Sequence, residues 1–351
     1  MKAIIHIGMM KTGSSSIQMW MQSARAALAA DGVRSNEDAI TFENLHRRAL
    51  THAAFELALQ EFDVKEKDAR ANLEKSLNKS AGMHEISKIL TKQFDKLSRK
   101  SGTFIYSDET LYNFNEIQMI ALDNFLSRFF EERNYVVYIR NFVDFFVSMY
   151  SQKLQNKRSY EHCTQEYSKF LEICMSTLVP YGVESSFGNL FEWSKVFGDR
   201  LDVRLLESDW LVNGDLIEDF ASLTGFATFV KLDRVNESLA AEYVEYVRLL
   251  NRKFKNNLRS KIRRKAISIL LDASSGKPKL AASDAQAKMI RDYHRGQEES
   301  IRKRFFPERS SLFSPKFRGS GLAPAPLTNR RKLEIESDIR EKLSPEVWPP
   351  Q

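Results

Sequence analysis

The chain has 351 residues, of which 42% are hydrophobic and 28% charged, which is typical of a soluble globular protein with one large or two ordinary domains. The net charge of +7 favours an anionic ligand such as a nucleotide, although charge alone identifies no partner. The two cysteines, Cys163 and Cys174, lie eleven residues apart with no histidine cluster nearby, so neither a disulfide framework nor a zinc site is indicated.

The sequence contains no run of about 18 apolar residues, which excludes a transmembrane helix. It starts directly on an apolar strand pattern, which leaves no room for a cleavable signal peptide. Together with the cysteine usage, these features lead us to expect a cytoplasmic protein without a membrane anchor, in a reducing compartment.

The first predicted element is an apolar run, Ala3 to Ile7, that is typical of a strand. It opens at Gly8 into a loop ending at Gly13, and a helical pattern over about 14–30 follows. Both glycines can adopt positive φ and bring backbone amides close to an anion, while the first turn of a helix presents unpaired N–H groups. Three successive serines, 14–16, add hydroxyl donors. This stretch therefore predicts an anion-binding site.

The loop has the Gly-x-x-x-x-Gly spacing of a Walker A motif, but Ser14 stands where a nucleoside triphosphatase carries lysine. The only cation nearby is Lys11, inside the loop. The stretch from His6 to Gln18 resembles the phosphosulfate loop of sulfotransferases that use 3′-phosphoadenosine 5′-phosphosulfate (PAPS), particularly bacterial members with a His-x-Gly-x-x-Lys-Thr-Gly-[Thr/Ser]-[Thr/Ser]-Ser-Ile-Gln opening. An ordinary strand-to-helix turn is the alternative. The resemblance implies that the donor is bound by Lys11, Thr12, Gly13, Ser14, Ser15 and Ser16.

Residues 35–100 are charged and helix-forming, with no strand pattern, and predict a long helical insert between two strands. In a parallel α/β protein such an insert leaves from the carboxyl end of the sheet, where it is placed to cover an acceptor site. His46 and His52 are candidate acceptor contacts within it, and plain helical packing is the alternative.

A second strand, Thr103 to Ser107, ends in Asp108 and Glu109. Carboxylates at the carboxyl end of a strand lie where ligands bind in such sheets. A Ser-[Ser/Asp]-Glu run occupies this place in the bacterial sulfotransferases, so the resemblance implies that Glu109 is the base for the acceptor hydroxyl. Capping of the next helix or pairing with a lysine is the alternative.

After a helix over 117–133, the strand Tyr135 to Arg140 leads into an apolar helix that carries Ser148. The Arg-x₇-Ser spacing resembles the pair with which sulfotransferases hold the 3′-phosphate of PAPS. Arginine offers a planar fork for phosphate oxygens, and a serine two helical turns later can point the same way. A solvated strand end and a small packing residue are the alternative.

In the second half we expect helices over 187–197 and 211–226, a strand over 201–206, a helix opening near Val235 and a last helix over 283–305. The block from Arg252 to Lys265 contains eight Lys or Arg residues and no acid, and predicts a basic amphipathic helix. It is interpreted as a solvated face, with contact to an anionic saccharide or peripheral contact with a membrane as the alternatives. No nucleic-acid partner is expected, since no recognised nucleic-acid fold accompanies the charge.

The resemblance implies a single P-loop-type α/β domain over residues 1–310, a three-layer sandwich. Its mostly parallel sheet is expected to have the first strand at its centre, helices on both faces and the helical insert. Residues 311–351 are rich in Pro, Gly and charge and are expected to form a loosely packed tail. Within it, 317–321 faintly resembles the late Arg-Lys-Gly loop of some sulfotransferases but lacks the lysine.

The implied activity is transfer of the sulfuryl group of PAPS to a hydroxyl or amine, with a carbohydrate or glycolipid as the expected acceptor and no metal required. Lys11 would stabilise the leaving phosphate, Glu109 would take the acceptor proton, and Arg140 with Ser148 would select the 3′-phosphate. Two other classes stay open. A phosphotransferase with an atypical loop would use Asp108 toward Mg²⁺, and a non-catalytic nucleotide-binding or polyanion-binding module would not need Glu109.

Overall fold

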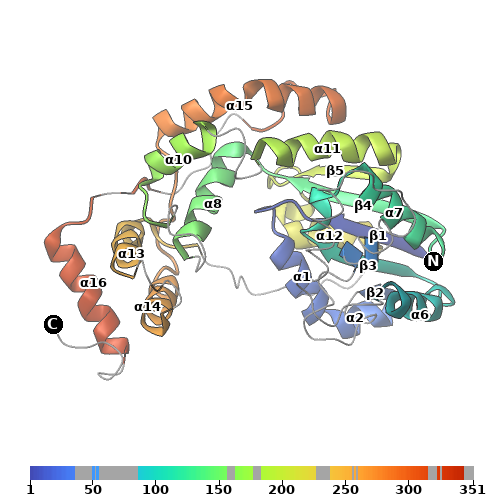
Figure 1. Cartoon of the computed structure of the whole chain (residues 1–351), viewed down its shortest axis with the longest axis horizontal. Coiled ribbons are helices and arrows are strands. Elements are labelled where there is room, and N and C mark those ends of the chain that lie inside the picture. The colour runs from blue at the N-terminus through green and yellow to red at the C-terminus, as the bar shows by residue number, and fades with distance from the viewer. Residues whose placement is uncertain are drawn as a thin grey trace, which may run out of the picture. The chain divides into compact units, whose positions relative to one another are not determined.

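The structure is a computed structural model that describes residues 1–35, 50–51, 53–54, 86–155, 163–176, 183–226, 238–254, 257, 260–314, 322–324 and 326–343. These residues belong to two compact units (Figure 1). Unit 1 comprises Met1–Arg140 and Gly182–Asp233, and unit 2 comprises Asn141–Tyr181 and Arg234–Gln351.

Unit 1 is built on a five-stranded sheet in the order β2-β3-β1-β4-β5, in which every pair is parallel. The strands are β1 Lys2–Ile7, β2 Val33–Ser35, β3 Thr103–Asp108, β4 Glu132–Ile139 and β5 Leu201–Leu205. The expected parallel sheet with the first strand at its centre is confirmed. Strands buried on both faces explain the continuous apolar runs in the sequence, because helices cover each side of a parallel sheet.

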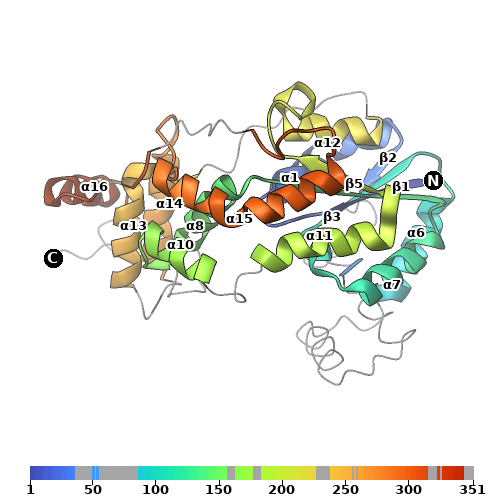
Figure 2. The ribbon, with the colours of Figure 1, turned by 90° about the horizontal axis from the view of Figure 1, so that it is seen from above.

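Helices pack on both faces of this sheet, as Figure 2 shows for α1 and α12 on one side and α6, α7 and α11 on the other. Their bounds are α1 Ser14–Ser23, α2 Arg25–Ala30, α6 Ile86–Ser98, α7 Glu116–Ser127, α11 Val183–Phe197 and α12 Leu216–Thr224. On the α1 face, the rings of Trp20 and Phe220 lie 6.1 Å apart. On the opposite face, the ring of Phe94 in α6 lies 5.2 Å from that of Phe104 in β3. Alternate residues of each strand thus serve two separate cores.

Unit 1 differs from the sequence-based expectation at α1, at β2 and before α12, where the helix expected over 211–226 begins only at Leu216. The helix expected over 14–30 is interrupted at Ala24, which separates α1 from α2. The short edge strand β2 was missed, because three residues are too few for an alternating pattern to stand out. Most of the expected insert, with His46 and His52, lies outside the described residues.

The described part of unit 2 consists of helices with two isolated bridges, at Ala240–Lys279 and Leu280–Leu322. The helices are α8 Phe142–Gln155, α10 Tyr167–Ser176, α13 Ala241–Lys253, α14 Lys261–Asp272, α15 Asp284–Phe305 and α16 Asn329–Lys342. The helix expected over 283–305 is confirmed as α15, although it is not the last helix, because α16 follows it. The start of α15 is a capping box between Ser283 and Gln286. In neither unit does the described chain include a helix long and apolar enough to cross a membrane.

The prediction of one basic helix across 252–265 was wrong. Helix α13 ends at Lys253, and Ser260, with φ −47° and ψ 131°, is the N-cap from which α14 begins. Serine favours such helix ends over helix interiors, a signal outweighed in the sequence by the continuing apolar face. One of the basic residues, Arg263, is fully buried, and donates hydrogen bonds to Asn251 Oδ1 at 2.6 Å and to the Leu154 carbonyl at 2.9 Å.

Part of the C-terminal segment expected to be loose is helical. Helix α16 starts with the Thr328 hydroxyl accepting from the backbone N–H of Arg331 at 3.2 Å. Ile335 and Ile339, one helical turn apart, are fully buried. This i, i+4 pair attaches the helix to its unit. Residues 317–321 lie outside the described chain.

Candidate anion-binding site

The loop 8–13 leaves the central strand β1 at the carboxyl edge of the sheet. From β1 the chain continues to β2 and β3 on one side and then crosses to β4 on the other. Such a reversal of strand order creates a crevice outside the strand ends, where α/β proteins bind their ligands. The loop therefore occupies the position in unit 1 that the topology favours for a site.

Neighbouring atoms leave no room for a side chain at either loop glycine. The backbone N–H of Gly8 donates to the Asp108 carbonyl at 3.1 Å, and a Cβ on Gly8 would lie 2.5 Å from Ser14 Oγ and 3.1 Å from Glu109 Cγ. Gly13 has a φ of +91°, and a methyl group there would overlap the side chain of Leu216 in α12. Because neither glycine carries a side chain, the loop can lie in close contact with the start of α1, with Glu109 and with α12.

The start of α1 presents donors to this crevice. Gly13 is the N-cap and contributes no side-chain acceptor, and the first turn contains no acidic residue. Ser14 is 1% exposed, and its hydroxyl has no hydrogen-bond partner in the described chain. Ser15 is exposed and Ser16 is half-buried. An uncapped helix N-terminus beside an unsatisfied buried hydroxyl is suited to an anion, because an anion satisfies both.

The loop holds Lys11 in a left-handed conformation, with φ at +63°. Two hydrogen bonds support it: the buried Thr12 hydroxyl donates to the Met9 carbonyl at 2.7 Å, and Arg140 Nη1 donates to the Lys11 carbonyl at 3.3 Å. The hydroxyl of Thr12, predicted to contact the donor, thus bonds to the loop itself. Arg140 is joined to the loop across 129 residues of sequence.

Lys11, Glu109 and Arg140 interact electrostatically at the ends of three neighbouring strands. Burial lowers the pKa of the Lys11 amino group, the Glu109 carboxylate opposes that shift, and the Arg140 guanidinium adds to it. These three predicted site residues therefore lie close enough for Glu109 and Arg140 to affect the pKa of Lys11. An additional anion would interact favourably with the two cations and unfavourably with the carboxylate.

The two adjacent carboxylates at the end of β3 have different surroundings. Asp108 is 2% exposed; its Oδ1 accepts from the Thr110 N–H at 2.8 Å and its Oδ2 accepts from the Thr51 hydroxyl at 2.6 Å. Glu109 is exposed to solvent. Asp108 therefore stabilises the loop that follows β3, whereas the Glu109 carboxylate is accessible to a ligand. No pattern in the sequence pointed to Thr51.

A buried histidine lies within the sheet beneath this loop. His6 Nδ1 is 2.8 Å from Ser107 Oγ, and Gln18 of α1 donates to the Ser107 carbonyl at 3.2 Å. Complete burial lowers the pKa of His6 to about 3, so its imidazole is neutral at physiological pH. His6 therefore joins β1 to β3 through Ser107 and packs against Tyr138 of β4 and Phe220 of α12 without adding charge.

Ser148, the other predicted contact for a 3′-phosphate, is half-buried on α8. Helix α8 belongs to unit 2, while Arg140 is the last residue of the first segment of unit 1. Of the other predicted residues, 11–16, Glu109 and Arg140 lie in unit 1 at the ends of β1, β3 and β4, whereas His46 and His52 lie outside the described residues. Leu216, which touches the loop at Gly13, was not anticipated.

No protein-family model matches the chain, and comparisons with curated proteins and with solved structures gave no significant match. Function is therefore inferred from the loop geometry and the sequence motifs.

Proposed function

We propose that the chain is a P-loop-type sulfotransferase that moves the sulfuryl group of PAPS to a hydroxyl group of an acceptor, with a carbohydrate or glycolipid as the expected acceptor class. The observation that carries the proposal is the convergence of four features at the carboxyl edge of the unit 1 sheet. They are an uncapped helix N-terminus, the unsatisfied Ser14 hydroxyl, Lys11, and Arg140 bound to the loop backbone. All four favour a ligand with phosphate-like groups.

The donor fits the residues present. The α1 amides and the Ser14 hydroxyl would donate hydrogen bonds to the 5′-phosphosulfate, while Arg140 would bind the 3′-phosphate that distinguishes PAPS from ATP. Serine in place of the Walker lysine supports sulfuryl rather than phosphoryl transfer. Both oxygens of Asp108, the acid considered for a magnesium site, already accept hydrogen bonds within the protein.

In the transfer itself, the acceptor oxygen attacks sulfur in line with the bridging oxygen of the phosphosulfate. The new O–S bond forms as the bridging S–O bond breaks, and the bond electrons stay on the phosphate. Lys11 stabilises the negative charge that develops there. Glu109 takes the proton of the acceptor hydroxyl, a role that its solvent exposure and its place beside Gly8 and Ser14 support.

Calorimetric titration of the full chain with 3′-phosphoadenosine 5′-phosphate, with ATP and AMP as comparators and no added metal, tests the donor site. We expect selective binding of the bisphosphate and at least about a tenfold loss in Arg140→Ala, because a charged hydrogen-bonding partner is removed. Arg140→Gln keeps a donor for the Lys11 carbonyl and separates loop support from phosphate recognition.

Arg34→Ala is the matched control. Arg34 also donates to a backbone carbonyl of unit 1, that of Ala29 at 3.0 Å, but lies on the edge strand β2. We expect Arg34→Ala to bind the nucleotide as the wild type does. Equal affinity for ATP, or unchanged binding in Arg140→Ala, would refute the proposed donor site. Selective binding would be followed by acceptor screening with labelled PAPS.

A further inference from the structure

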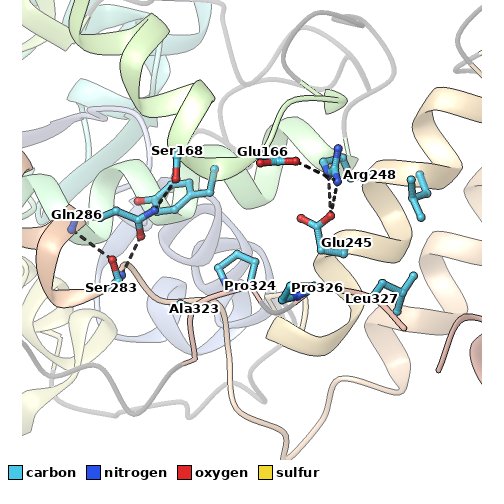
Figure 3. Close-up of a pocket in the computed structure, with 12 residues that line it drawn as sticks. Glu166, Ser168, Glu245, Arg248, Ser283, Gln286, Ala323, Pro324, Pro326 and Leu327 are labelled. Atoms are coloured by element: carbon cyan, nitrogen blue, oxygen red, sulfur yellow. Dashed lines mark hydrogen bonds and ion pairs between the residues drawn. The ribbon is translucent and has the colours of Figure 1, made fainter. Parts of the chain in front are cut away.

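Unit 2 contains a cavity of its own, with a volume of about 440 Å³ (Figure 3). Four segments line it: the start of α10, the middle of α13, the start of α15 and the stretch around Pro324 and Pro326. Leu322 anchors that last stretch, because its N–H donates to the Lys279 carbonyl at 2.9 Å and its carbonyl accepts from Ala281 at 3.0 Å. The volume lies within the range of small-molecule sites, about 300–1,000 Å³.

The charged side chains that line this cavity, one arginine and two glutamates, are paired with one another. Figure 3 shows the Arg248 guanidinium joined by dashed lines to the carboxylates of both Glu166 and Glu245. Arg248 Nε donates to Glu245 Oε2 at 2.8 Å, and Nη2 lies 3.6 Å from Glu166 Oε1. A phosphate or sulfate group would be repelled by the two carboxylates, and an ammonium group would have to compete with Arg248, with which both carboxylates are already paired. The charge pattern therefore favours a neutral ligand.

The side chains that line the cavity include both hydrogen-bond donors and hydrogen-bond acceptors. Gln286 donates from Nε2 to Ser168 Oγ at 3.0 Å and accepts at Oε1 from the Ser283 N–H at 2.9 Å. Two buried groups on lining residues, Arg248 Nη1 and the Tyr167 hydroxyl, have no hydrogen-bond partner among the residues that the structure describes. Such groups retain the capacity to bond to a ligand or to water. A ligand rich in hydroxyl groups can both donate to and accept from this set.

The remaining wall is apolar and stiff. Pro324, Pro326, Leu327 and Leu249 line it, and the two prolines have no backbone N–H and a fixed φ. A surface of this kind suits the C–H face of a sugar ring, while the polar wall takes the hydroxyl groups.

We propose that the cavity of unit 2 binds a neutral saccharide of one or two rings, with Glu245, Arg248 and Gln286 contacting its hydroxyl groups and the Pro324–Leu327 side packing against its ring. This binding site is separate from the loop of unit 1. It is tested without any measurement of sulfuryl transfer, so its failure leaves the donor-site proposal to be judged on nucleotide binding alone.

Ligand-observed NMR and calorimetry on the full chain would use a defined panel as probes: glucose, galactose, N-acetylglucosamine, maltose, lactose and cellobiose, each at up to about 10 mM, so that even millimolar affinity is detected. Glucose 6-phosphate and glucosamine would serve as the anionic and cationic comparators. We expect at least one neutral sugar to bind, and to bind more tightly than either charged analogue. Binding of none of the panel, or tighter binding of glucose 6-phosphate, would overturn the proposal.

Two pairs of variants assign the binding to the cavity. Ser168→Trp fills it from an exposed position and should abolish sugar binding, whereas Lys169→Trp, the exposed neighbour outside the lining, should not. Glu245→Gln should weaken binding about tenfold through loss of a charged acceptor. Glu299→Gln alters a similar i, i+3 pair with Arg302 on α15 and should change nothing. Undiminished binding by a folded Ser168→Trp chain would refute the location.

Discussion

Replacement of Gly13 by alanine tests whether the loop is held by close contact with α12. Alanine at a φ of +91° costs about 1–2 kcal/mol relative to glycine. The added methyl group also overlaps Leu216, and overpacking of this kind costs a further 1–3 kcal/mol or so. We therefore expect Gly13→Ala to lower the free energy of unfolding of unit 1 by about 2–5 kcal/mol.

Leu216→Ala separates the two contributions. Leu216 is half-buried, so its truncation alone should cost about 1 kcal/mol. In the double variant the overlap is relieved while the backbone strain stays, and the combined loss should be about 1–3 kcal/mol smaller than the sum of the single losses. Bisphosphate affinity, weakened in Gly13→Ala, should recover in part for the same reason.

Urea unfolding followed by tryptophan fluorescence measures these differences. Three of the four tryptophans, Trp20, Trp193 and Trp210, belong to unit 1, so the signal reports mainly on that unit. The urea concentrations at the unfolding midpoint should be compared only between variants with the same dependence of unfolding free energy on urea, because the two units need not unfold in one step. A loss below about 0.5 kcal/mol in Gly13→Ala, or simple additivity in the double variant, would refute the close contact between loop and α12.

Two pH dependences follow from the site. Burial lowers the pKa of Lys11, so its charge is lost at a lower pH than in an ordinary lysine, and bisphosphate affinity should fall as the pH rises through that value. In Lys11→Arg this loss of bisphosphate affinity should occur at a higher pH. The same pH dependence of affinity in calorimetric titrations of both proteins would contradict the role of Lys11. His6 has a pKa of about 3 in the folded chain against 6.5 as its ordinary value, so the unfolded chain binds more protons between these values. Stability should therefore fall as the pH drops below about 6.5, by about 2 kcal/mol at pH 5, and His6→Gln should remove this part of the slope in urea titrations at several pH values. An unaltered slope would show that another group is responsible.

The strands of unit 1 could be predicted from the sequence because each is an apolar run buried on both faces. β1, β3, β4 and β5 all fall within a few residues of the predicted ranges. Helix α15 could be predicted equally well, since Ser283 and Gln286 at its start form a capping box that is local in the sequence. Where the signal was short or contradictory, as at β2 and at Ser260, the prediction was absent or wrong.

The candidate site was predictable to the extent that local motifs carry it. Gly8, Lys11 and Gly13 lie in one short stretch, and the strand-loop-helix pattern around them is local. The contacts of Gly13 with Leu216 and of Asp108 with Thr51 join distant segments, and no periodicity in a single sequence encodes such pairs. The cavity of unit 2 was invisible for the same reason, because four separated segments line it.

The left-handed backbone conformation of Lys11 is unfavourable for a residue with a side chain. A lysine at a φ of +63° is less stable there than glycine by about 1 kcal/mol, and asparagine would tolerate the position better. The cost is offset by the hydrogen bonds from Thr12 and Arg140 that fix the loop on both sides of the residue. Glycine at this position would keep those bonds and remove the strain, but it would also remove the cation beside Glu109. The structure thus retains a charge at the expense of backbone stability, which is the arrangement expected where the charge acts on a ligand.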